Sequence, residues 1–417
     1  MADEDVVPEN WVRMVAASAV VGLATGVLIL AVKSLVEKAN KELLKADPWT
    51  ISVILMAGVV ATVLIVQWFA GRSASTTDRY IEQFHDESAP IDVRNAPGRL
   101  VASVTTGASG VPMGLEGPAV YAGSAVATAV RRWPGVFASV DVHSLMVAGA
   151  AAGVAAVFKA PLAGVLFALE APYRRTFVHS AVLPALVGST VGYLTLIAVK
   201  GAEPELALGG VEITVGYIFG AASLGVICGL AARGFAFLIN KAEQYSTRQP
   251  AIVRGLVAGA LLVGLYLLGR AATDENVAIT AGFNAAEWAL DPDNSVPLLL
   301  LVLGIRVVVT SVAVGGGMVG GLFVPLVAMG AIVGALVADV ASVEETTLYV
   351  IVGAAAFLGA GYGTPLAAVA FVAEITGLPG FIIPGLVAVA AAQLMMSNRT
   401  VSPAQTESGH AASATHE

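Results

Sequence analysis

A single acidic residue stands inside a glycine-rich stretch, Gly107–Pro118, which reads Gly-Ala-Ser-Gly-Val-Pro-Met-Gly-Leu-Glu-Gly-Pro. This residue is Glu116, and the apolar segment 119–130 follows it directly. Glycine frees the backbone and proline suits a first helical turn, so the stretch is typical of a loop that ends one membrane helix and starts the next. Free N–H groups and the positive end of a helix dipole favour an anion there. The pattern predicts an anion pathway gated by Glu116; the alternative is a carboxylate that only caps its own helix.

A second polar run lies upstream, at residues 73–78, with the sequence Ser-Ala-Ser-Thr-Thr-Asp. The amphipathic segment Arg79–His85 follows it and predicts a short half-helix. Small hydroxylated side chains can cap a helix or point into a pore. From this run alone, capping is the favoured interpretation.

The other reactive side chains form no catalytic or metal-binding pattern. The five histidines show no metal-ligand spacing, and no Ser/His/Asp set lies in the apolar segments. The single cysteine, Cys228, lies in an apolar run, where a small buried side chain is expected. The sequence therefore predicts neither an enzyme nor a cofactor.

The composition indicates a membrane protein: 57% of the 417 residues are hydrophobic, 12% are charged, and the mean hydropathy is +0.81. A net charge of −8 argues against a nucleic-acid partner. A hydrocarbon core of about 30 Å takes roughly 20 helical residues, so the sequence predicts a multi-pass helical protein of the cell membrane. The apolar runs of this length are Met14–Val32, Ile51–Phe69, Val178–Val199, Val215–Ile239, Ile252–Leu268, Val296–Val314 and Tyr349–Val372.

Two apolar segments that contain proline repeat one another. Pro161–Glu170 aligns without gaps on Pro365–Glu374, with identity at six of ten positions. Each follows a glycine-rich loop that ends in a proline, Pro118 in the first half and Pro325 in the second. Paired, interrupted apolar segments at matching places are typical of an inverted-repeat transporter, whose site lies where half-helix N-termini converge.

Charged residues at the ends of these segments can be explained without a role in transport. Glu170 and Glu374 end the two repeated segments, and a structural role is favoured for both. Lys159 precedes the first segment; it either adds positive potential to a vestibule or extends its amine to the membrane interface.

Three blocks in this order resemble the signature blocks of the CLC family of chloride channels and chloride/proton antiporters. The blocks are Gly114–Pro118 (Gly-Leu-Glu-Gly-Pro), 158–170 (Phe-Lys-Ala-Pro-Leu-Ala-Gly-Val-Leu-Phe-Ala-Leu-Glu) and Gly321–Pro325 (Gly-Leu-Phe-Val-Pro). The resemblance covers roughly residues 10–405. It implies an all-α fold of two antiparallel halves built from tilted and broken transmembrane helices.

The resemblance also implies a domain organisation. Residues 1–12 are expected to form a cytoplasmic N-terminal segment, and residues 13–405 a single transmembrane domain with halves at about 13–210 and 211–405. The polar residues 406–417 are expected to be a disordered tail. Family members are homodimers with one independent pore per subunit and both termini in the cytoplasm.

Site residues follow from the matched blocks. The family's external gate, the glutamate of the first block, maps to Glu116. A hydroxyl on the inner side of the central anion maps to Ser75, and serine there goes with chloride. Backbone amides of the first block line the outer anion position and amides of the third hold the central anion; here these residues are Leu115, Gly117, Leu322 and Phe323.

The chain departs from the family pattern at several positions. Leu115 stands where arginine is usual, and the block around Ser75 lacks the usual glycines and proline. Ala171 occupies the position of the internal glutamate that proton-coupled members commonly carry. The tyrosine that normally meets the central anion is replaced by Gln405, with Ser402 nearby, so these two residues are the candidates for an inner gate.

The sequence predicts chloride transport through a glutamate-gated pore, with chloride, and in a coupled mechanism protons, as partners in a lipid bilayer. Because the internal glutamate is absent, channel-like or weakly coupled behaviour is the favoured mode. A stoichiometric chloride/proton antiporter is the alternative. A cation-coupled transporter of an organic anion is a more distant one, since no intramembrane Asp/Asn cluster is present.

Overall fold

The computed structural model describes residues 9–69, 76–86, 93–133, 137–174, 176–206, 215–343, 345–397 and 399–407, and all statements below concern these. Their regular secondary structure is helical, which agrees with the expected fold class. The first half holds α1 (Glu9–Leu43), α2 (Pro48–Phe69), α3 (Thr77–His85), α4 (Ala96–Ala108), α5 (Glu116–Arg131), α6 (Val142–Phe158), α7 (Pro161–Glu170) and α8 (Val182–Lys200). The second half holds α9 (Val215–Arg248), α10 (Ala251–Thr273), α11 (Phe283–Trp288), α12 (Val296–Gly316), α13 (Phe323–Val340), α14 (Thr346–Tyr362), α15 (Pro365–Thr376) and α16 (Ile382–Met396), and short 3-10 turns precede α8 and α16.

Eight of the described helices are long and apolar enough to cross a membrane. Six of the apolar runs fall on such helices, and the seventh, Tyr349–Val372, is divided between α14 and α15, as the interrupted segment at Pro365 predicted. Gly363, with φ +70°, ends α14 in a left-handed conformation, and Pro365 starts α15 two residues later. The sequence also missed the span Phe323–Val340, because its glycine-rich start and Pro325 read as a loop.

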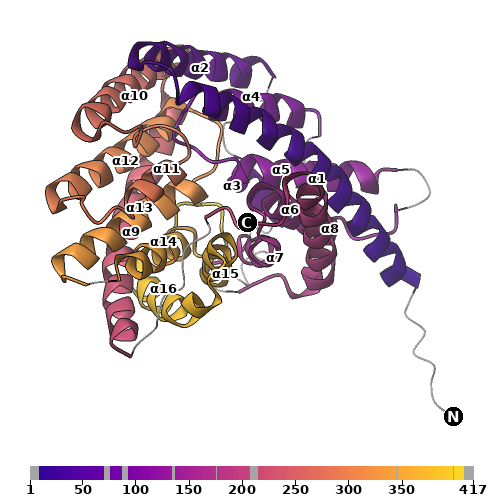
Figure 1. The fold of residues 1–417 in the computed structure, drawn as a ribbon. Helices are drawn as coiled ribbons and strands as arrows, with labels where there is room; N and C mark the ends of the chain where they lie inside the picture. The colour runs from indigo at the N-terminus through magenta and orange to yellow at the C-terminus, as the bar shows by residue number, and fades with distance from the viewer. Residues whose placement is uncertain are drawn as a thin grey trace, which may run out of the picture.

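The packing of the first half recurs in the second. Helix α5 packs on α6 and α1 on α8, just as α13 packs on α14 and α9 on α16. The halves meet where α7 lies against α15 and α2 against α10 (Figure 1). The expected boundary between the halves, at 210/211, lies outside the described residues, as does most of the two terminal segments, so the domain division stays a prediction.

Glycines allow the closest helix contacts in both halves. A Cβ atom on Gly123 of α5 would overlap the carbonyl of Gly149 of α6, and a Cβ on Gly149 would overlap the carbonyl of Gly123. Gly330 of α13 and Gly353 of α14 stand in the same relation. Close backbone approach through small residues is a usual way to pack membrane helices.

The two glutamates of the repeated segments cap each other's helices. The Glu170 carboxylate accepts the N–H groups of Leu366 (3.2 Å) and Ala367 (2.9 Å), at the start of α15. The Glu374 carboxylate accepts those of Leu162 and Ala163, at the start of α7, both at 2.9 Å. Each negative charge thus meets the positive end of a helix from the other half. This exchange is the structural role that the sequence favoured.

Lys159 follows α6 in a left-handed conformation, with φ +55°. Its Nζ donates to the Glu203 carbonyl at 3.2 Å and lies 3.9 Å from the Glu205 carboxylate. The same carboxylate pairs more closely with Lys33, at 2.6 Å, so the choice between the two expected roles of Lys159 stays a prediction.

Candidate anion site and gate

The two glycine-rich loops meet through a backbone pair. Gly114 and Gly321 form an antiparallel bridge, with N–H···O distances of 2.9 Å and 2.8 Å in the two directions. Helix α5 begins two residues after Gly114, and α13 begins two residues after Gly321. The bridge therefore brings two helix N-termini from opposite halves to one place, which is the arrangement that attracts an anion.

Glu116 lies at this meeting point and is completely buried. Its Oε1 accepts the Phe323 N–H at 2.5 Å, at the first residue of α13. Its Oε2 has no hydrogen-bond partner in the described part of the chain. A Cβ atom on Gly114 or on Gly321 would overlap the carboxyl group, so both positions must stay glycine for this rotamer to exist. The carboxylate thus occupies a backbone donor that was expected to hold the central anion.

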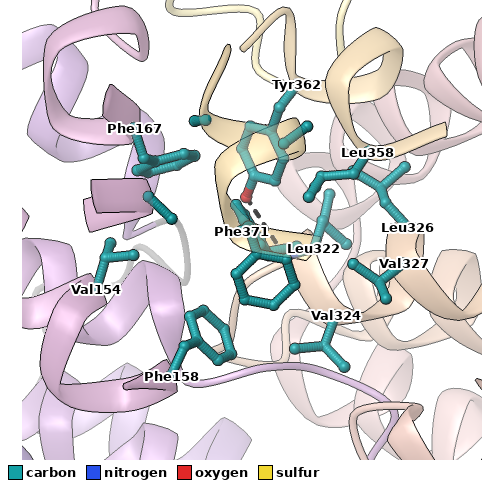
Figure 2. Close-up of a cluster of buried hydrophobic side chains, with 14 of the residues drawn as sticks. Val154, Phe158, Phe167, Leu322, Val324, Leu326, Val327, Leu358, Tyr362 and Phe371 are labelled. Atoms are coloured by element: carbon teal, nitrogen blue, oxygen red, sulfur yellow. Dashed lines mark hydrogen bonds between the residues drawn. The ribbon is translucent and has the colours of Figure 1, made fainter. Parts of the chain in front are cut away.

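The other expected central donor faces a phenol. The Leu322 N–H points to the hydroxyl oxygen of Tyr362 at 3.4 Å, and Tyr362 is the last residue of α14 (Figure 2). The tyrosine is 3% exposed. No signal in the sequence singled out this residue, because it ends an apolar segment and precedes Gly363 without a recognisable motif. Only the folded chain brings its hydroxyl to the third block.

Aromatic rings fix the start of α13. The Phe323 ring stacks on Phe158 with centroids 5.4 Å apart, and it meets Phe371 edge-on at 4.6 Å. Phe167 lies edge-on to Phe323, with centroids 5.5 Å apart. It also lies edge-on to Tyr362, at 5.4 Å (Figure 2). This apolar wall excludes water from one side of the site, which strengthens the electrostatic interactions there.

Hydroxyl groups approach the site from the start of α3. A Cβ atom built on Gly117 would lie 2.5 Å from Thr76 Oγ1 and 2.9 Å from Thr77 Oγ1, so both hydroxyls lie against this glycine. Thr76 is the N-cap residue of α3 but its side chain makes no capping hydrogen bond. Its Oγ1 is buried and finds no partner among the residues described here. Ser75, the hydroxyl that the resemblance assigned to the anion, lies outside the described residues.

The two candidates for an inner gate have different surroundings. Ser402 is 2% exposed and donates its hydroxyl hydrogen to Asp78. Gln405 is equally buried, and its side-chain N–H groups donate to the carbonyls of Ala171 and Tyr362, both at 3.0 Å. Both amide hydrogens are therefore engaged with backbone oxygens. Gln405 positions Tyr362 at the end of α14, whereas Ser402 faces the cavity described next.

A cavity of about 370 Å³ leads to the Leu322–Tyr362 contact. It is wide enough for several water molecules or hydrated ions. Charged groups of both signs and three kinds of hydroxyl line it. Its walls include Thr76, Asp78, Arg79, Glu243, Arg254, Leu322, Tyr362 and Ser402.

The remaining sequence-assigned donors also lie at the meeting point. Leu115 is the N-cap residue of α5, and Gly117 is the second residue of that helix. The structure thus brings Leu115, Glu116, Gly117, Leu322 and Phe323 together, although their roles as anion ligands stay predictions. Ala171 is completely buried after the end of α7, so no titratable side chain stands at the position of the usual internal glutamate.

Comparisons with known proteins agree with this architecture. Residues 57–397 match the family described as voltage gated chloride channel. The chain is 27% identical over 404 residues to the H(+)/Cl(-) exchange transporter ClcA of Salmonella paratyphi A. The aligned region covers 91% of this chain and 84% of the relative. The Citrobacter koseri ClcA matches with the same identity and coverage.

Solved structures share the fold. A slow cyanobacterial Cl-/H+ antiporter superposes with a TM-score of 0.81 at 24% identity, covering 92% of this chain and 94% of that one. A CLC-type fluoride/proton antiporter superposes with a TM-score of 0.85 at 21% identity, covering 97% and 100%. The matched family, the paired half-helices and the buried glutamate between two helix N-termini lead to one conclusion. The chain belongs to the CLC family of voltage-gated chloride channels and transporters, and is a multi-pass membrane protein of anion transport rather than an enzyme.

Proposed function

We propose that this protein exchanges chloride for protons. In this scheme chloride displaces the Glu116 carboxylate from the Phe323 N–H, and the displaced carboxylate binds the proton. The observation that carries this proposal is the hydrogen bond between the Glu116 carboxylate and the Phe323 N–H. A carboxylate in that position is a stand-in for the transported anion. It is also a proton acceptor, which a permanent anion ligand would not be.

The exchange follows from competition for the same donors. Chloride that enters the site takes over the amides of Leu322 and Phe323 and displaces the carboxylate. The displaced carboxylate binds a proton, loses its attraction to the helix N-termini and stays away while the anion moves on. Deprotonation returns it to Phe323. Backbone amides of Leu115 and Gly117 form the outer anion position in this scheme.

Hydroxyls complete the central position. Thr76 and Tyr362 reach it from α3 and α14, and both suit a single-charged anion because they donate hydrogen bonds without trapping the ion by a full positive charge. In this scheme Tyr362 supplies the phenol that the family pattern places near residue 405.

The named relatives favour exchange over the channel-like mode that the sequence favoured. The ClcA proteins of Salmonella and Citrobacter are H(+)/Cl(-) exchange transporters. The buried Ala171 is the specific observation for the rival, a channel without proton coupling, because it removes the usual inner proton acceptor.

Purified protein in liposomes with a chloride gradient tests the proposal directly. Protons should move uphill as chloride runs down its gradient, and the proton-to-chloride ratio should stay fixed as the gradient changes. Chloride flux without proton movement would leave a channel as the function.

The variant Glu116→Gln should keep chloride flux but lose proton movement. Flux through the wild type should increase as the pH falls, since protonation releases the carboxylate from Phe323, and this pH dependence should vanish in the variant. Glu275→Gln, at an exposed position, is the matched control. An unchanged proton-to-chloride ratio in Glu116→Gln would contradict the gate assignment.

A further inference from the structure

Proton exchange, on which this inference rests, needs a route from the inner solution to Glu116. In the family pattern a glutamate would stand at the position of Ala171, but this residue is apolar and completely buried. The Ala171 carbonyl accepts a hydrogen bond from the Gln405 amide, and Ala171 does not line the cavity beside the site. A titratable group on another element is therefore needed to bring the proton to the site.

The cavity of about 370 Å³ offers that direction. Leu322 and Tyr362 line it, and the next residue, Phe323, carries the N–H that binds Glu116. Thr76 also lines it, with a buried Oγ1 that has no protein partner among the described residues and is therefore available to water or an ion. Bridging waters in such a cavity connect polar groups about as well as direct hydrogen bonds do.

Two carboxylates line the same cavity, and their contacts differ. Asp78 lies in the first turn of α3, accepts the Ser402 hydroxyl, and is stabilised as an anion by the helix N-terminus. Glu243, near the end of α9, forms no hydrogen bond or ion pair within the part of the chain that the structure describes. It is half-buried in the cavity wall.

Charged side chains of two other helices, α3 and α10, surround Glu243. From α3, the negative charges of Asp78 and Glu82 act on it, while Arg79 of that helix pairs with Glu82 at 2.9 Å. From α10, Arg254 lines the cavity and donates to the Ser246 carbonyl. Glu243 therefore experiences the charge of two carboxylates, and it shares the cavity wall with Arg254.

We propose that Glu243 is the inner proton acceptor of this transporter. It takes a proton from the inner solution and passes it through cavity water, along the hydroxyls of Thr76 and Tyr362, to the Glu116 carboxylate. Each transfer breaks one O–H bond and forms another, and the negative charge returns to Glu243 when the proton leaves. Glu243 thereby takes the place of the missing glutamate, from a different helix and a different wall.

The first test is Glu243→Gln in chloride-loaded liposomes. Proton movement per chloride should fall by at least about tenfold, as expected when a positioned proton carrier is lost, while chloride flux stays within about twofold. The matched control is Glu275→Gln, which removes an exposed carboxylate outside the cavity wall. An unchanged proton-to-chloride ratio in Glu243→Gln would overturn the inference. Absence of coupling in the wild type would instead overturn the proposed function, and this inference with it.

A chemical rescue separates proton transfer from a structural role. Glu243→Cys should transport chloride without protons, and its folding is verified by that flux. Iodoacetate then alkylates the thiolate with loss of iodide and leaves a carboxylate on the side chain, which should restore coupling. Iodoacetamide adds a neutral amide of similar size and should not. The native Cys228 is completely buried, so the introduced thiol is the accessible one. Equal recovery with both reagents, or with neither, would contradict the proton-acceptor role.

Discussion

Individual side chains decide what the anion meets in this protein. Tyr362 carries the clearest example, because its hydroxyl lies 3.4 Å from the Leu322 N–H at the expected central position. The residue pattern pointed instead to the segment near Gln405. In the folded chain the Gln405 amide donates to the Tyr362 carbonyl. In the proposed site Tyr362 therefore presents the hydroxyl donor, and Gln405 holds the backbone of Tyr362 in position.

Tyr362→Phe should weaken chloride binding. A hydrogen bond to a charged group contributes about 1.5 kcal/mol or more, so the chloride dissociation constant should rise by about tenfold. Isothermal titration of the purified protein with chloride measures this. Tyr266→Phe is the control. This buried tyrosine of α10 donates its hydroxyl hydrogen to Asn276 and does not line the cavity. Equal affinities of Tyr362→Phe and the wild type would remove Tyr362 from the site.

Thr76→Val should also weaken chloride binding, independently of Tyr362. Valine keeps the shape of threonine and removes a buried hydroxyl that has no partner in the described chain, so folding should be unaffected or slightly improved. Chloride affinity should fall several-fold in the same titration. Thr105→Val removes a hydroxyl bonded within its own helix and serves as the control. If Thr76→Val binds chloride like the wild type, Ser75 becomes the stronger candidate for the inner hydroxyl.

At the scale of elements, the half-helices α7 and α15 depend on each other. Each is too short to cross a bilayer, and each has its free N–H groups satisfied by a glutamate at the end of the other. Unsatisfied backbone groups at membrane depth are costly, which explains why both half-helices carry a glutamate at their tenth residue.

Glu170→Gln and Glu374→Gln should each destabilise the protein. A glutamine amide places N–H hydrogens near the N–H groups that the carboxylate accepted, at a cost of about 1–3 kcal/mol. The thermal midpoint in detergent should fall in both variants, and further in Glu170→Gln, because Glu170 is 7% exposed and Glu374 is less buried. Unaltered midpoints would show that the exchange of caps contributes little to stability.

At the scale of the whole molecule, we expect a homodimer, as the family resemblance implies. The face formed by α8 and α16 exposes large apolar side chains, including Leu186 at 44% and Ile383 at 62%. The half-helices α7 and α15 lie next to these two helices, so a partner subunit on this face would also cover helix ends that lipid cannot satisfy.

The mass of the protein in detergent tests this assembly. It should correspond to two chains of 42.2 kDa, and Ile383→Trp should shift the protein towards a single chain by preventing close contact. Leu261→Trp, on the exposed side of α10, is the control and should leave the mass unchanged. A single-chain mass for the wild type would contradict the dimer.

The sequence by itself determined the class of protein, the paired broken segments and Glu116 as the central residue. These are local properties: apolar runs of membrane length, prolines in register, and a carboxylate among glycines are visible without knowing which segments touch. Only the tertiary structure decided which group binds the carboxylate and which groups line the cavity nearby. The Phe323 amide that binds it lies 207 positions from Glu116, Tyr362 and Glu243 of the cavity lie 246 and 127 positions away, and no local pattern encodes an arrangement over such separations. They meet because two oppositely oriented halves each aim helix N-termini at the same point, and their packing leaves the cavity beside it.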